Sequence, residues 1–259
     1  MGARIATTSN RSRRDRWNRS DRGLTARSTS SELANIVSSR RLGMDKSPLD
    51  YAGFRHEYIG GGLRRTDLDP DPVKQFHAWF AAAIKSGIHD ANAMTLATCV
   101  DRKPSARVVL LKDFDERGFV FFTNYASDKG QQLEKNPNAS LLMYWMEVER
   151  QIRIEGKVEK TSREESEQYF HSRPIGAQLG AWASHQSQVI DGRRILNARL
   201  EEMKQRFAEG EVPLPPHWGG YRLGPDRMEF WQGRPDRLHD RFRYTLQSSG
   251  SWSIDRLAP

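Results

Sequence analysis

Apolar residues along this chain recur at two spacings, which predict helices in some segments and strands in others. Residues 71–84 open with an Asp-Pro pair, typical of an N-cap and a first helical residue, and their apolar residues then follow helical spacing. A second helix is expected to begin with a capping box formed by Thr161 and Glu164. A third is expected over about residues 192–208, with these apolar side chains on one face: Leu196, Leu200, Met203 and Phe207.

Short apolar runs of strand length lie among these helices. Turn-forming segments such as DRKP and DFDERG separate them. Their even spacing predicts an antiparallel sheet or barrel, so we expect a β-rich α+β fold with flanking helices in a single domain. The expected strands cover residues 93–100, 105–112, 118–124, 139–146, 150–159, 219–223, 227–232, 237–244 and 251–257.

The positive charge of the chain is concentrated near its N-terminus. Residues 1–45 hold ten arginines against four acidic residues, so they carry +6 of the formal +8. Because they are rich in Ser and Arg and poor in aromatic residues, we expect residues 1–50 to be a basic, disordered extension and residues 51–259 to form the folded domain. An organelle transit segment and a nucleic-acid-binding tail are the alternatives for this extension. The nearly neutral body has no matching basic face, which disfavours a nucleic-acid partner.

Composition narrows the location and the chemistry. A single cysteine, Cys99, excludes an intrachain disulfide, favours a cytoplasmic location and is expected to be buried in the core. No run reaches the roughly 20 apolar residues of a membrane span, and the chain does not open on a signal-peptide-like segment. Phosphate loops, dinucleotide-binding turns, nucleophile elbows and metal-binding spacings are absent from the sequence. A bound phosphate would therefore be held by Arg and Lys side chains, and no metal is expected.

The segment RPDRLHDR near the C-terminus concentrates charge after an aromatic run. If it continues as a strand, three side chains share one face: Arg237, His239 and Arg241. Leu238 and Phe242 would then face an apolar layer. Three cationic or ionisable groups on one face repel one another unless an anion lies between them. A solvent-exposed edge strand, charged to prevent aggregation, explains the same pattern equally well.

Two further segments place cations near strand or helix ends. In SARVVLLK, Arg107 and Lys112 fall on opposite faces of a regular strand. Either the strand bends, or the two cations serve two different ligands or two parts of one site. Alternatively, they extend into solvent from the ends of a core strand. In TNYASDKG, Lys129 follows Ser127 at an expected helix start, where free N–H groups attract anions. Asp128 would repel a phosphate there, and simple helix capping is the alternative.

Polar side chains in three other segments could contact a polar ligand. Tyr169 and Arg173 are four residues apart, so they share a helical face on which a phenol and a guanidinium suit a phosphate. Gln186 and Ser187 are neutral hydrogen-bonding groups in an otherwise apolar segment, and Gln151 begins an expected strand. An ordinary helix end and a polar loop are the alternatives for these residues.

Together these segments supply cations for two phosphates, amides for a polar ring system and an aromatic wall at Trp231. This combination suits a phosphorylated cofactor and a phosphorylated substrate. From about residue 51 to 259 the chain resembles the pyridoxine (pyridoxamine) 5′-phosphate oxidase family. The resemblance rests on many motifs in the same order: GGLRR, DPVKQF, NAMTLAT, KPSARVVLLK, FFTNY, NPNASLLMYW, ERQIRIEG, YFHSRP, SHQS, WGGYRL, EFWQG, RLHDR and RLAP.

The resemblance implies a split β-barrel homodimer that binds FMN at the subunit interface. It assigns FMN contacts to Arg107, Val108, Val109, Leu110, Phe122, Thr123, Lys129, Gln151, Gln186, Ser187, Trp231 and Arg241. It assigns substrate contacts to Arg55, Tyr58, Lys112, Tyr169, Arg173, Arg237 and His239. In this scheme Arg55 and Tyr58 lie on a segment that covers the substrate, and RLHDR is an active-site strand.

The resemblance also implies a reaction. Pyridoxamine or pyridoxine 5′-phosphate is oxidised to pyridoxal 5′-phosphate, a step of vitamin B6 salvage, while FMN takes the hydride and dioxygen becomes hydrogen peroxide. Arg237 and His239 are expected to be the catalytic residues, which orient the substrate and help to handle its proton. The alternatives are a split-barrel flavoprotein that acts on another substrate and one that only binds or stores its cofactor. The separate RLHDR and YFHSRP segments favour the oxidase.

The chain departs from the family pattern at two positions. Asp128 stands where the family often has arginine, so one cation toward the FMN phosphate is missing and weaker FMN binding is expected. Ala177 stands where the family often has serine, whose hydroxyl reaches the substrate phosphate. Losing a hydrogen bond to a charged group costs about 1.5 to 3 kcal/mol, so we expect a raised KM rather than lost activity.

Overall fold

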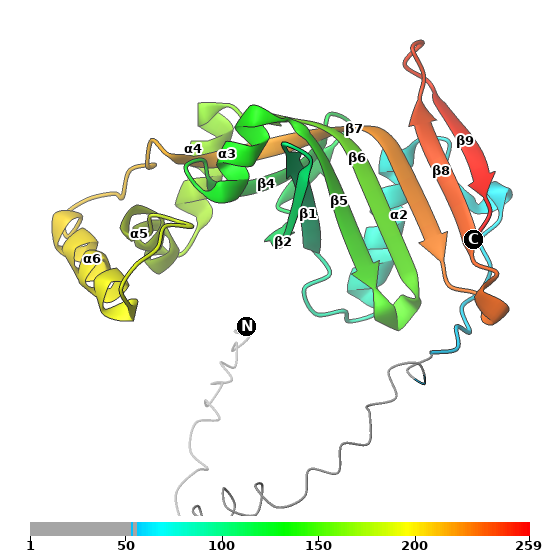
Figure 1. The fold of residues 1–259 in the computed structure, drawn as a ribbon, viewed down its shortest axis with the longest axis horizontal. Coiled ribbons are helices and arrows are strands. Elements are labelled where there is room, and N and C mark those ends of the chain that lie inside the picture. Colours follow the sequence, from blue (N-terminus) through cyan, green and yellow to red (C-terminus); the bar gives the residue numbers. More distant parts are fainter. Residues whose placement is uncertain (1–52, 54–55) are drawn as a thin grey trace, which may run out of the picture. The chain divides into compact units, whose positions relative to one another are not determined.

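The computed structural model describes Gly53 and residues 56–259 of the chain (Figure 1). The expected basic extension, residues 1–50, and the predicted substrate contact Arg55 therefore lie outside the described residues. Among the described helices, none is both long and apolar enough to cross a membrane.

Antiparallel strands join into one sheet within the described residues. The strand order is β2-β1-β5-β6-β7-β4-β3, with β8 on the free edge of β7 and β9 on β8. A β-rich fold with flanking helices is thus confirmed. The strands are β1 (Ala93–Val100), β2 (Lys103–Leu110), β3 (Asp113–Asp115), β4 (Gly118–Asn124), β5 (Asn138–Trp145), β6 (Arg150–Lys160), β7 (Trp218–Gln232), β8 (Asp240–Leu246) and β9 (Trp252–Leu257).

One long strand, β7, replaces the two strands predicted over residues 219–223 and 227–232. Its length pairs with β6, while its other edge pairs first with β4 and then with β8. The pairing with β6 shifts register between Glu155 and Gly156, opposite the sequence Gly-Pro-Asp. Those three residues indicate a turn when taken alone, but a β-bulge lets them stay within a continuous strand. This strand therefore joins β4 to the C-terminal strands β8 and β9 in one sheet.

The helices pack on the sheet and at one end of it. Asp71 caps α2 as predicted, since its carboxylate accepts a hydrogen bond from the N–H of Val73 at 2.8 Å. The buried face of α2 packs on the sheet through Phe76, whose ring centroid lies 4.8 Å from that of Phe119. The helices are α2 (Pro72–Lys85), α3 (Asp128–Lys135), α4 (Arg163–Ser172), α5 (Ile175–Ala183) and α6 (Arg193–Arg206), with short 3-10 turns at Arg65–Asp67, Met146–Val148 and Pro235–Arg237.

Two helix predictions need correction. The capping box of α4 is formed by Ser162 and Glu165, one residue later than predicted. The reason is that Thr161, directly after the end of β6, is still hydrogen bonded to β7: its N–H donates to the carbonyl of Gly220 at 3.0 Å. Helix α5 was not predicted, because it contains two glycines and no side chain caps its N-terminus at Pro174. Together α4, α5 and α6 surround a second apolar cluster that includes Phe170 and Trp218.

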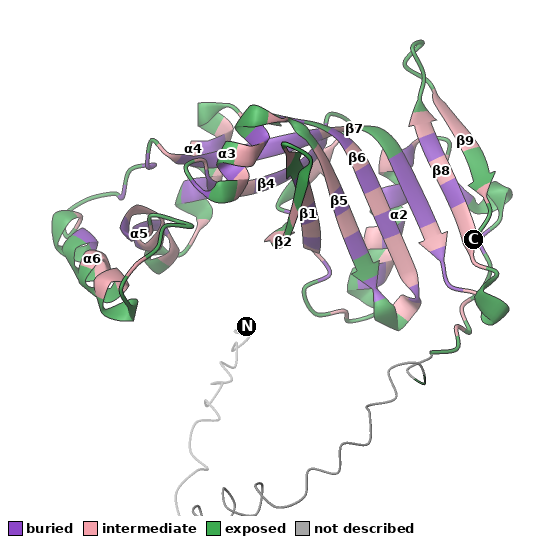
Figure 2. Cartoon of the chain, viewed as in Figure 1, coloured by how far each residue is buried: buried purple, intermediate pink, exposed green. Residues whose placement is uncertain are grey.

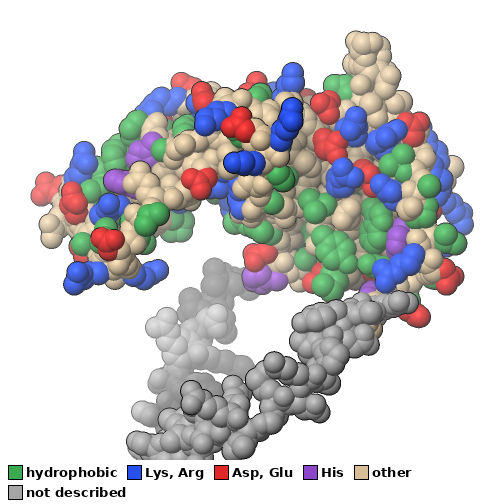
Figure 3. Space-filling view, viewed as in Figure 1, with side chains coloured by type: hydrophobic (Ala, Val, Ile, Leu, Met, Phe, Trp, Pro, Cys, Tyr) green, Lys and Arg blue, Asp and Glu red, His purple; other side chains and the backbone are tan. Residues whose placement is uncertain are grey.

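The strand register gives the sheet one buried face and one more open face. Burial alternates along β6 and β8, whereas β7 is buried in two continuous runs (Figure 2). Met94 and Leu96 point into the core, whereas Cys99 lies on the open face and is exposed. The prediction of a buried Cys99 is therefore wrong, because only alternate residues of the apolar strand reach the core. On the visible surface basic and acidic side chains are mixed, with apolar side chains between them (Figure 3).

Candidate active site

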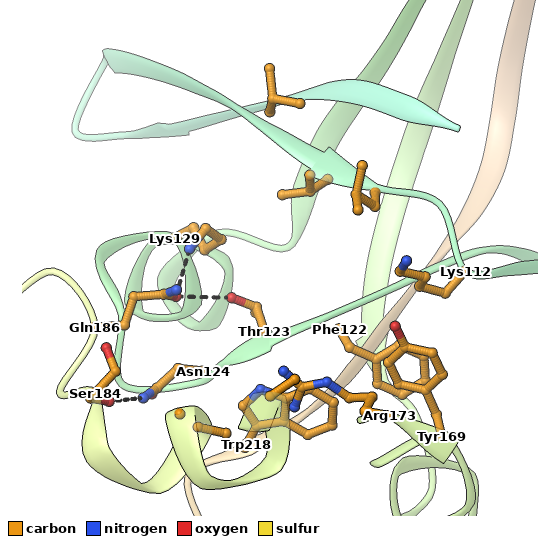
Figure 4. Close-up of a pocket in the computed structure, with 16 residues that line it drawn as sticks. Lys112, Phe122, Thr123, Asn124, Lys129, Tyr169, Arg173, Ser184, Gln186 and Trp218 are labelled. Atoms are coloured by element: carbon orange, nitrogen blue, oxygen red, sulfur yellow. Dashed lines mark hydrogen bonds between the residues drawn. The ribbon is translucent and has the colours of Figure 1, made fainter. Parts of the chain in front are cut away.

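A cavity of about 590 Å³ opens between strands β2 and β4 and helices α3, α4 and α5 (Figure 4). Ten of the predicted FMN and substrate contacts line it, as does Ala177. The ten are Val108, Val109, Leu110, Lys112, Phe122, Thr123, Lys129, Tyr169, Arg173 and Gln186. Residues far apart in the sequence thus meet around one hollow.

At one side of the cavity an ammonium group is held by neutral partners. Lys129 lies at the start of α3, which Ser127 caps as predicted. Its Nζ donates to Oε1 of Gln186 at 2.8 Å, and Thr123 donates to the same oxygen at 3.2 Å (Figure 4). Burial lowers the pKa of Lys129, and so does the positive charge of Arg107, while Asp128 opposes the shift. A charge that is disfavoured in the free site in this way is one that a bound anion would stabilise.

Arg107 lies beside this ammonium group, behind the cavity wall. Its guanidinium donates to three neutral oxygens, which belong to Thr98, Ser105 and Gln132, at 2.8, 2.6 and 2.8 Å. Burial lowers the pKa of Arg107, and the charge of Asp128 partly opposes that shift. The three neutral acceptors fix the orientation of the guanidinium without cancelling its charge, so it adds to the positive potential at Lys129.

The other side of the cavity is built on stacked aromatic rings. Phe122 and Tyr169 stack with centroids 4.0 Å apart, and Trp218 stacks on Phe122 at 5.5 Å. The guanidinium of Arg173 lies 4.7 Å from the centre of the Trp218 ring, and its Nη1 is buried without a hydrogen-bond partner. Burial lowers the pKa of Arg173. With Lys112 on the same cavity, this arrangement fits a second anionic group.

The predicted catalytic residues lie in a separate cluster around Tyr58. The Tyr58 ring is edge-on to Trp231 at 5.4 Å and to His239 at 5.1 Å, and the guanidinium of Arg237 lies 5.4 Å from its centre. Burial lowers the pKa of His239, as do the charges of Arg237 and Arg241. The backbone N–H of Arg234 donates to Nδ1 of His239 at 3.2 Å, so a neutral ring carries its proton on Nε2.

The prediction that RLHDR forms a strand is wrong for its first half. Pro235–Arg237 form a 3-10 turn, and both Asp236 and Arg237 have positive φ angles. Strand β8 begins only at Asp240, so alternation does not place Arg237 and His239. Leu238 is 69% exposed instead of packing on an apolar layer. The turn and the contacts with Tyr58, rather than strand geometry, bring the two predicted catalytic side chains together.

Three predicted FMN contacts form a row across neighbouring strands. Gln151 on β6 pairs with Trp231 on β7, which pairs with Arg241 on β8. The guanidinium of Arg241 donates to both carboxylate oxygens of Glu229, at 2.8 and 3.1 Å, and to the carbonyl of Ala258 at 2.8 Å. This row lies on the open face of the sheet, and none of its members lines the cavity described above.

The remaining predicted FMN contact, Ser187, lies near the start of α3. Its Oγ accepts a hydrogen bond from the N–H of Asp128 at 3.2 Å, and its own φ is +74°. Sequence reasoning missed several residues of the cavity and of the row formed by Gln151, Trp231 and Arg241. Asn124, Ser184 and Trp218 line the cavity, while the role of Glu229 follows only from the strand register. An aromatic residue before paired glycines, as at Trp218, was the one signal that could have been read.

Comparisons with known proteins found matches over most of the chain. A family model described as "Pyridoxamine 5'-phosphate oxidase" matches residues 80–207, and one described as "Pyridoxine 5'-phosphate oxidase C-terminal dimerisation region" matches residues 218–259. A curated relative from Rippkaea orientalis, named pyridoxine/pyridoxamine 5'-phosphate oxidase, is 55% identical over 212 residues, which cover 82% of this chain and 100% of the relative.

Two solved structures are similar in fold. One is PhzG from Burkholderia lata 383 in complex with tetrahydrophenazine-1-carboxylic acid, with a TM-score of 0.73, 32% identity, and coverage of 79% of this chain and 100% of that one. The other is a pyridoxamine 5'-phosphate oxidase-related, FMN binding protein from Nostoc punctiforme, with a TM-score of 0.59, 17% identity, and coverage of 74% and 98%. The sheet described above is thus the split barrel that these structures share.

Proposed function

Because this chain belongs to the pyridoxamine 5′-phosphate oxidase family, we propose that it oxidises pyridoxamine or pyridoxine 5′-phosphate to pyridoxal 5′-phosphate, with FMN as cofactor and dioxygen as electron acceptor. The observation that carries the proposal is a single cavity with cations at two sides. These two positions suit the two phosphates that cofactor and substrate would bring. Ammonia is the further product when the substrate is the amine.

The residues around Lys129 fit the phosphate of FMN. The ammonium group of Lys129 and the guanidinium of Arg107 both have pKa values lowered by burial, and their hydrogen-bond partners named above are neutral. A phosphate placed there would compensate both charges. The chemistry that FMN would supply is hydride acceptance from the C4′ carbon, with dioxygen as the final acceptor. Thr123 and Gln186 would hold the ring system through neutral hydrogen bonds.

Lys112, Tyr169 and Arg173 are assigned to the substrate phosphate. The buried and unpartnered Nη1 of Arg173 supports this assignment, because a buried donor without an acceptor costs free energy until an anion binds. The relative PhzG was solved with a tricyclic carboxylic acid, so a carboxylate ligand is the competing candidate for this side of the cavity. A phosphate is favoured here, because ammonium, phenol and guanidinium groups together supply more donors than one carboxylate can use.

We further propose that a second copy of the chain completes the site. Val108 on the cavity wall pairs with Thr95, and Thr95 pairs with Leu142, which lies two residues before Tyr144 on the same face of β5. Tyr144 pairs in turn with Gln151, so the cavity wall and the Trp231 row occupy one face of one sheet. A twofold-symmetric contact through this face would set the cavity of each copy against the row of the other, twice per dimer.

In such a dimer Arg237 and His239 would act on a substrate held by the other copy. The lowered pKa favours the neutral form of the His239 ring, and in that form the bond from Arg234 to Nδ1 leaves the Nε2–H to donate. We therefore assign His239 to orientation of the substrate over the flavin, since proton removal would require the other tautomer. Arg237 would fix the substrate from the side of Tyr58.

The first experiment is the visible spectrum of the purified protein without oxygen, before and after pyridoxine 5′-phosphate is added. The proposal expects a flavin spectrum that bleaches and recovers when air is admitted. A spectrum that bleaches with the phenazine-type acid but not with the phosphate would overturn the substrate assignment. A protein that binds no flavin after incubation with FMN would overturn the cofactor assignment.

Shared sites can be tested by mixing two defective variants, Arg173→Ala and His239→Ala. Random exchange of subunits makes half of the dimers mixed. In each mixed dimer one of the two sites carries neither change, so about a quarter of wild-type activity should return. If each site lay within one chain, mixing would restore no activity.

We also propose a cytoplasmic location, for which the single cysteine is the support.

A further inference from the structure

The buried carboxylate of Glu149 binds the backbone of Ile59 and Gly60. Its two oxygens accept hydrogen bonds from the N–H of Ile59 at 3.0 Å each, and one of them also accepts from the N–H of Gly60 at 2.7 Å. His56 lies 3.4 Å away as an ion-pair partner when protonated. Ninety residues of sequence separate Glu149 from this segment, so the contact is a tertiary one that joins the turn after β5 to residues 56–62. We call residues 56–62 the covering segment.

The surroundings of Glu149 are shaped for this close approach. A Cβ at Gly60 would lie 2.8 Å from a carboxylate oxygen of Glu149 and 2.6 Å from the amide nitrogen of Gln232. A Cβ at Gly233 would lie 2.5 Å from the Tyr58 ring. Both positions therefore need glycine for the covering segment to settle as it does.

The backbone of Glu149 is also unusual. Its φ of +54° lies in the left-handed region, which residues other than glycine seldom adopt. Its carbonyl accepts a hydrogen bond from the N–H of Gly233 at 2.8 Å, which ties the turn after β5 to the end of β7. A strained residue that persists is held by surrounding contacts, and such residues concentrate at functional sites.

The covering segment carries Tyr58 into the cluster of predicted catalytic residues. Tyr58 lies between Trp231 and His239, and Arg237 packs over its ring. At its far end the segment is tied independently, because the N–H of the next residue, Leu63, donates to Asp240 at 2.9 Å. Loss of the Glu149 contacts would thus loosen residues 56–60, which would then depend on the ring contacts of Tyr58 and on the bond from Arg234 to the carbonyl of Gly60.

We propose that Glu149 is a positioning residue, which holds the covering segment so that Tyr58 closes over the substrate. The proposal rests on the role assigned to Tyr58 under the proposed function. The Glu149 carboxylate accepts its hydrogen bonds from Ile59 and Gly60, so its side chain acts through the covering segment. The carboxylate remains charged because hydrogen bonds from Ile59 and Gly60 and the charge of His56 outweigh the effect of burial, which alone would raise the pKa of Glu149.

This role predicts an effect on affinity rather than on turnover. One hydrogen bond to a charged group changes an equilibrium about tenfold or more. When the closed state of a site becomes less populated, the apparent affinity falls by the same factor, while the saturated complex still reacts. Glu149→Ala should therefore raise KM for pyridoxine 5′-phosphate about tenfold and leave kcat within about twofold of wild type.

The test uses FMN-loaded, full-length enzyme and four variants. Glu149→Ala removes the acceptor, and Gly60→Ala pushes the covering segment away while the carboxylate stays. Glu147→Gln is the matched control, because Glu147 is an exposed carboxylate on the same turn. Steady-state kinetics give KM and kcat, and hydrogen–deuterium exchange reports on the amides of Ile59 and Gly60. We expect Glu149→Ala and Gly60→Ala to raise both KM and amide exchange, and Glu147→Gln to change neither.

The outcomes separate the positioning role of Glu149 from the role assigned to Tyr58. Unchanged amide exchange in Glu149→Ala, or a lower kcat with unchanged KM, would overturn the positioning role. The fourth variant, Tyr58→Ala, separates the premises. If it leaves KM unchanged while Glu149→Ala speeds exchange, the assigned role of Tyr58 fails and with it the functional part of the inference. If Glu149→Ala does not fold, Gly60→Ala decides through the same two readings.

Discussion

Asp128 offers a direct measure of how the site holds a flavin phosphate. It is an exposed carboxylate at the first residue of α3, next to Lys129. Its charge opposes the lowering of pKa that burial causes at both Lys129 and Arg107, so it lies within electrostatic reach of both cations. Replacement by asparagine removes that charge with little change in shape. We expect Asp128→Asn to bind FMN more tightly.

The magnitude follows from Coulomb's law. A phosphate at the Lys129 ammonium would lie about 8 Å from the neighbouring carboxylate, where two unit charges interact by about 1 kcal/mol at an effective dielectric of about 40. A phosphate charge near −2 doubles this repulsion to about 2 kcal/mol. Screening at physiological salt reduces it to about 0.7 kcal/mol, which is a threefold gain in affinity. At about 0.01 M salt the screening almost disappears and the gain should rise to roughly tenfold.

Quenching of flavin fluorescence during titration of the apoenzyme gives the dissociation constant at both salt concentrations. Riboflavin, which has no phosphate, is the ligand control, and Glu209→Gln, an exposed carboxylate after α6, is the protein control. The variant should also lose a little apoenzyme stability, because an acidic group at a helix N-terminus contributes about 0.3 to 1 kcal/mol. Equal gains for FMN and riboflavin, or a gain that does not depend on salt, would refute the electrostatic reasoning.

Three further predictions concern single residues. Ala177→Ser should lower KM for pyridoxine 5′-phosphate about tenfold, since the hydroxyl would face the cavity, and an unchanged KM counts against the substrate-phosphate assignment. Gly156→Ala should lower the free energy of unfolding by about 2 kcal/mol or more, because its Cβ would lie 2.0 Å from the carbonyl oxygen of Gly224. In Gly176→Ala, where nothing lies within 4 Å of a new Cβ, thermal unfolding should show no loss. The pKa of His239 is lower in the folded protein than in the unfolded chain, so the unfolded chain takes up a proton first as the pH falls. The free energy of unfolding should therefore decrease as the pH falls below the unfolded pKa of about 6.5. Chemical unfolding at pH 7.5 and 5.5 should show a smaller acid-induced loss in His239→Gln than in wild type; an equal loss would contradict the shift.

Local sequence signals predicted most of the secondary structure. The strand over residues 118–124 has the predicted bounds, and the Asp-Pro pair marks the start of α2, because strand alternation and helix capping depend on neighbouring residues. The errors arise where tertiary pairing overrides the local signal. Thr161 resembles a cap but pairs with β7, and the turn residues within β7 are absorbed by a bulge opposite Gly156.

The candidate site divides in the same way. Residue type and resemblance placed cations such as Lys112, Lys129 and Arg173 around one cavity. They could not identify the carboxylates that orient the structure, Glu149 and Glu229, because a glutamate in a strand or turn has no local mark of burial. Its partners become known only when strand register and a segment ninety residues away are known.

Among the described arginines whose pKa is shifted, the direction of the shift separates two kinds. Glu229 raises the pKa of Arg241, whose charge is already matched within the chain, so in the proposed FMN site Arg241 would serve as an oriented hydrogen-bond donor. Burial lowers the pKa of Arg107, which donates to neutral groups, and of Arg173, which packs over Trp218. Arg150 shares the lowered pKa, but its guanidinium packs over Trp79 and donates to Gln232. Arg107 and Arg173 are therefore the arginines that would gain most from an incoming anion, because Arg173 lines the cavity where the two phosphates are proposed to bind and Arg107 lies behind its wall, beside Lys129.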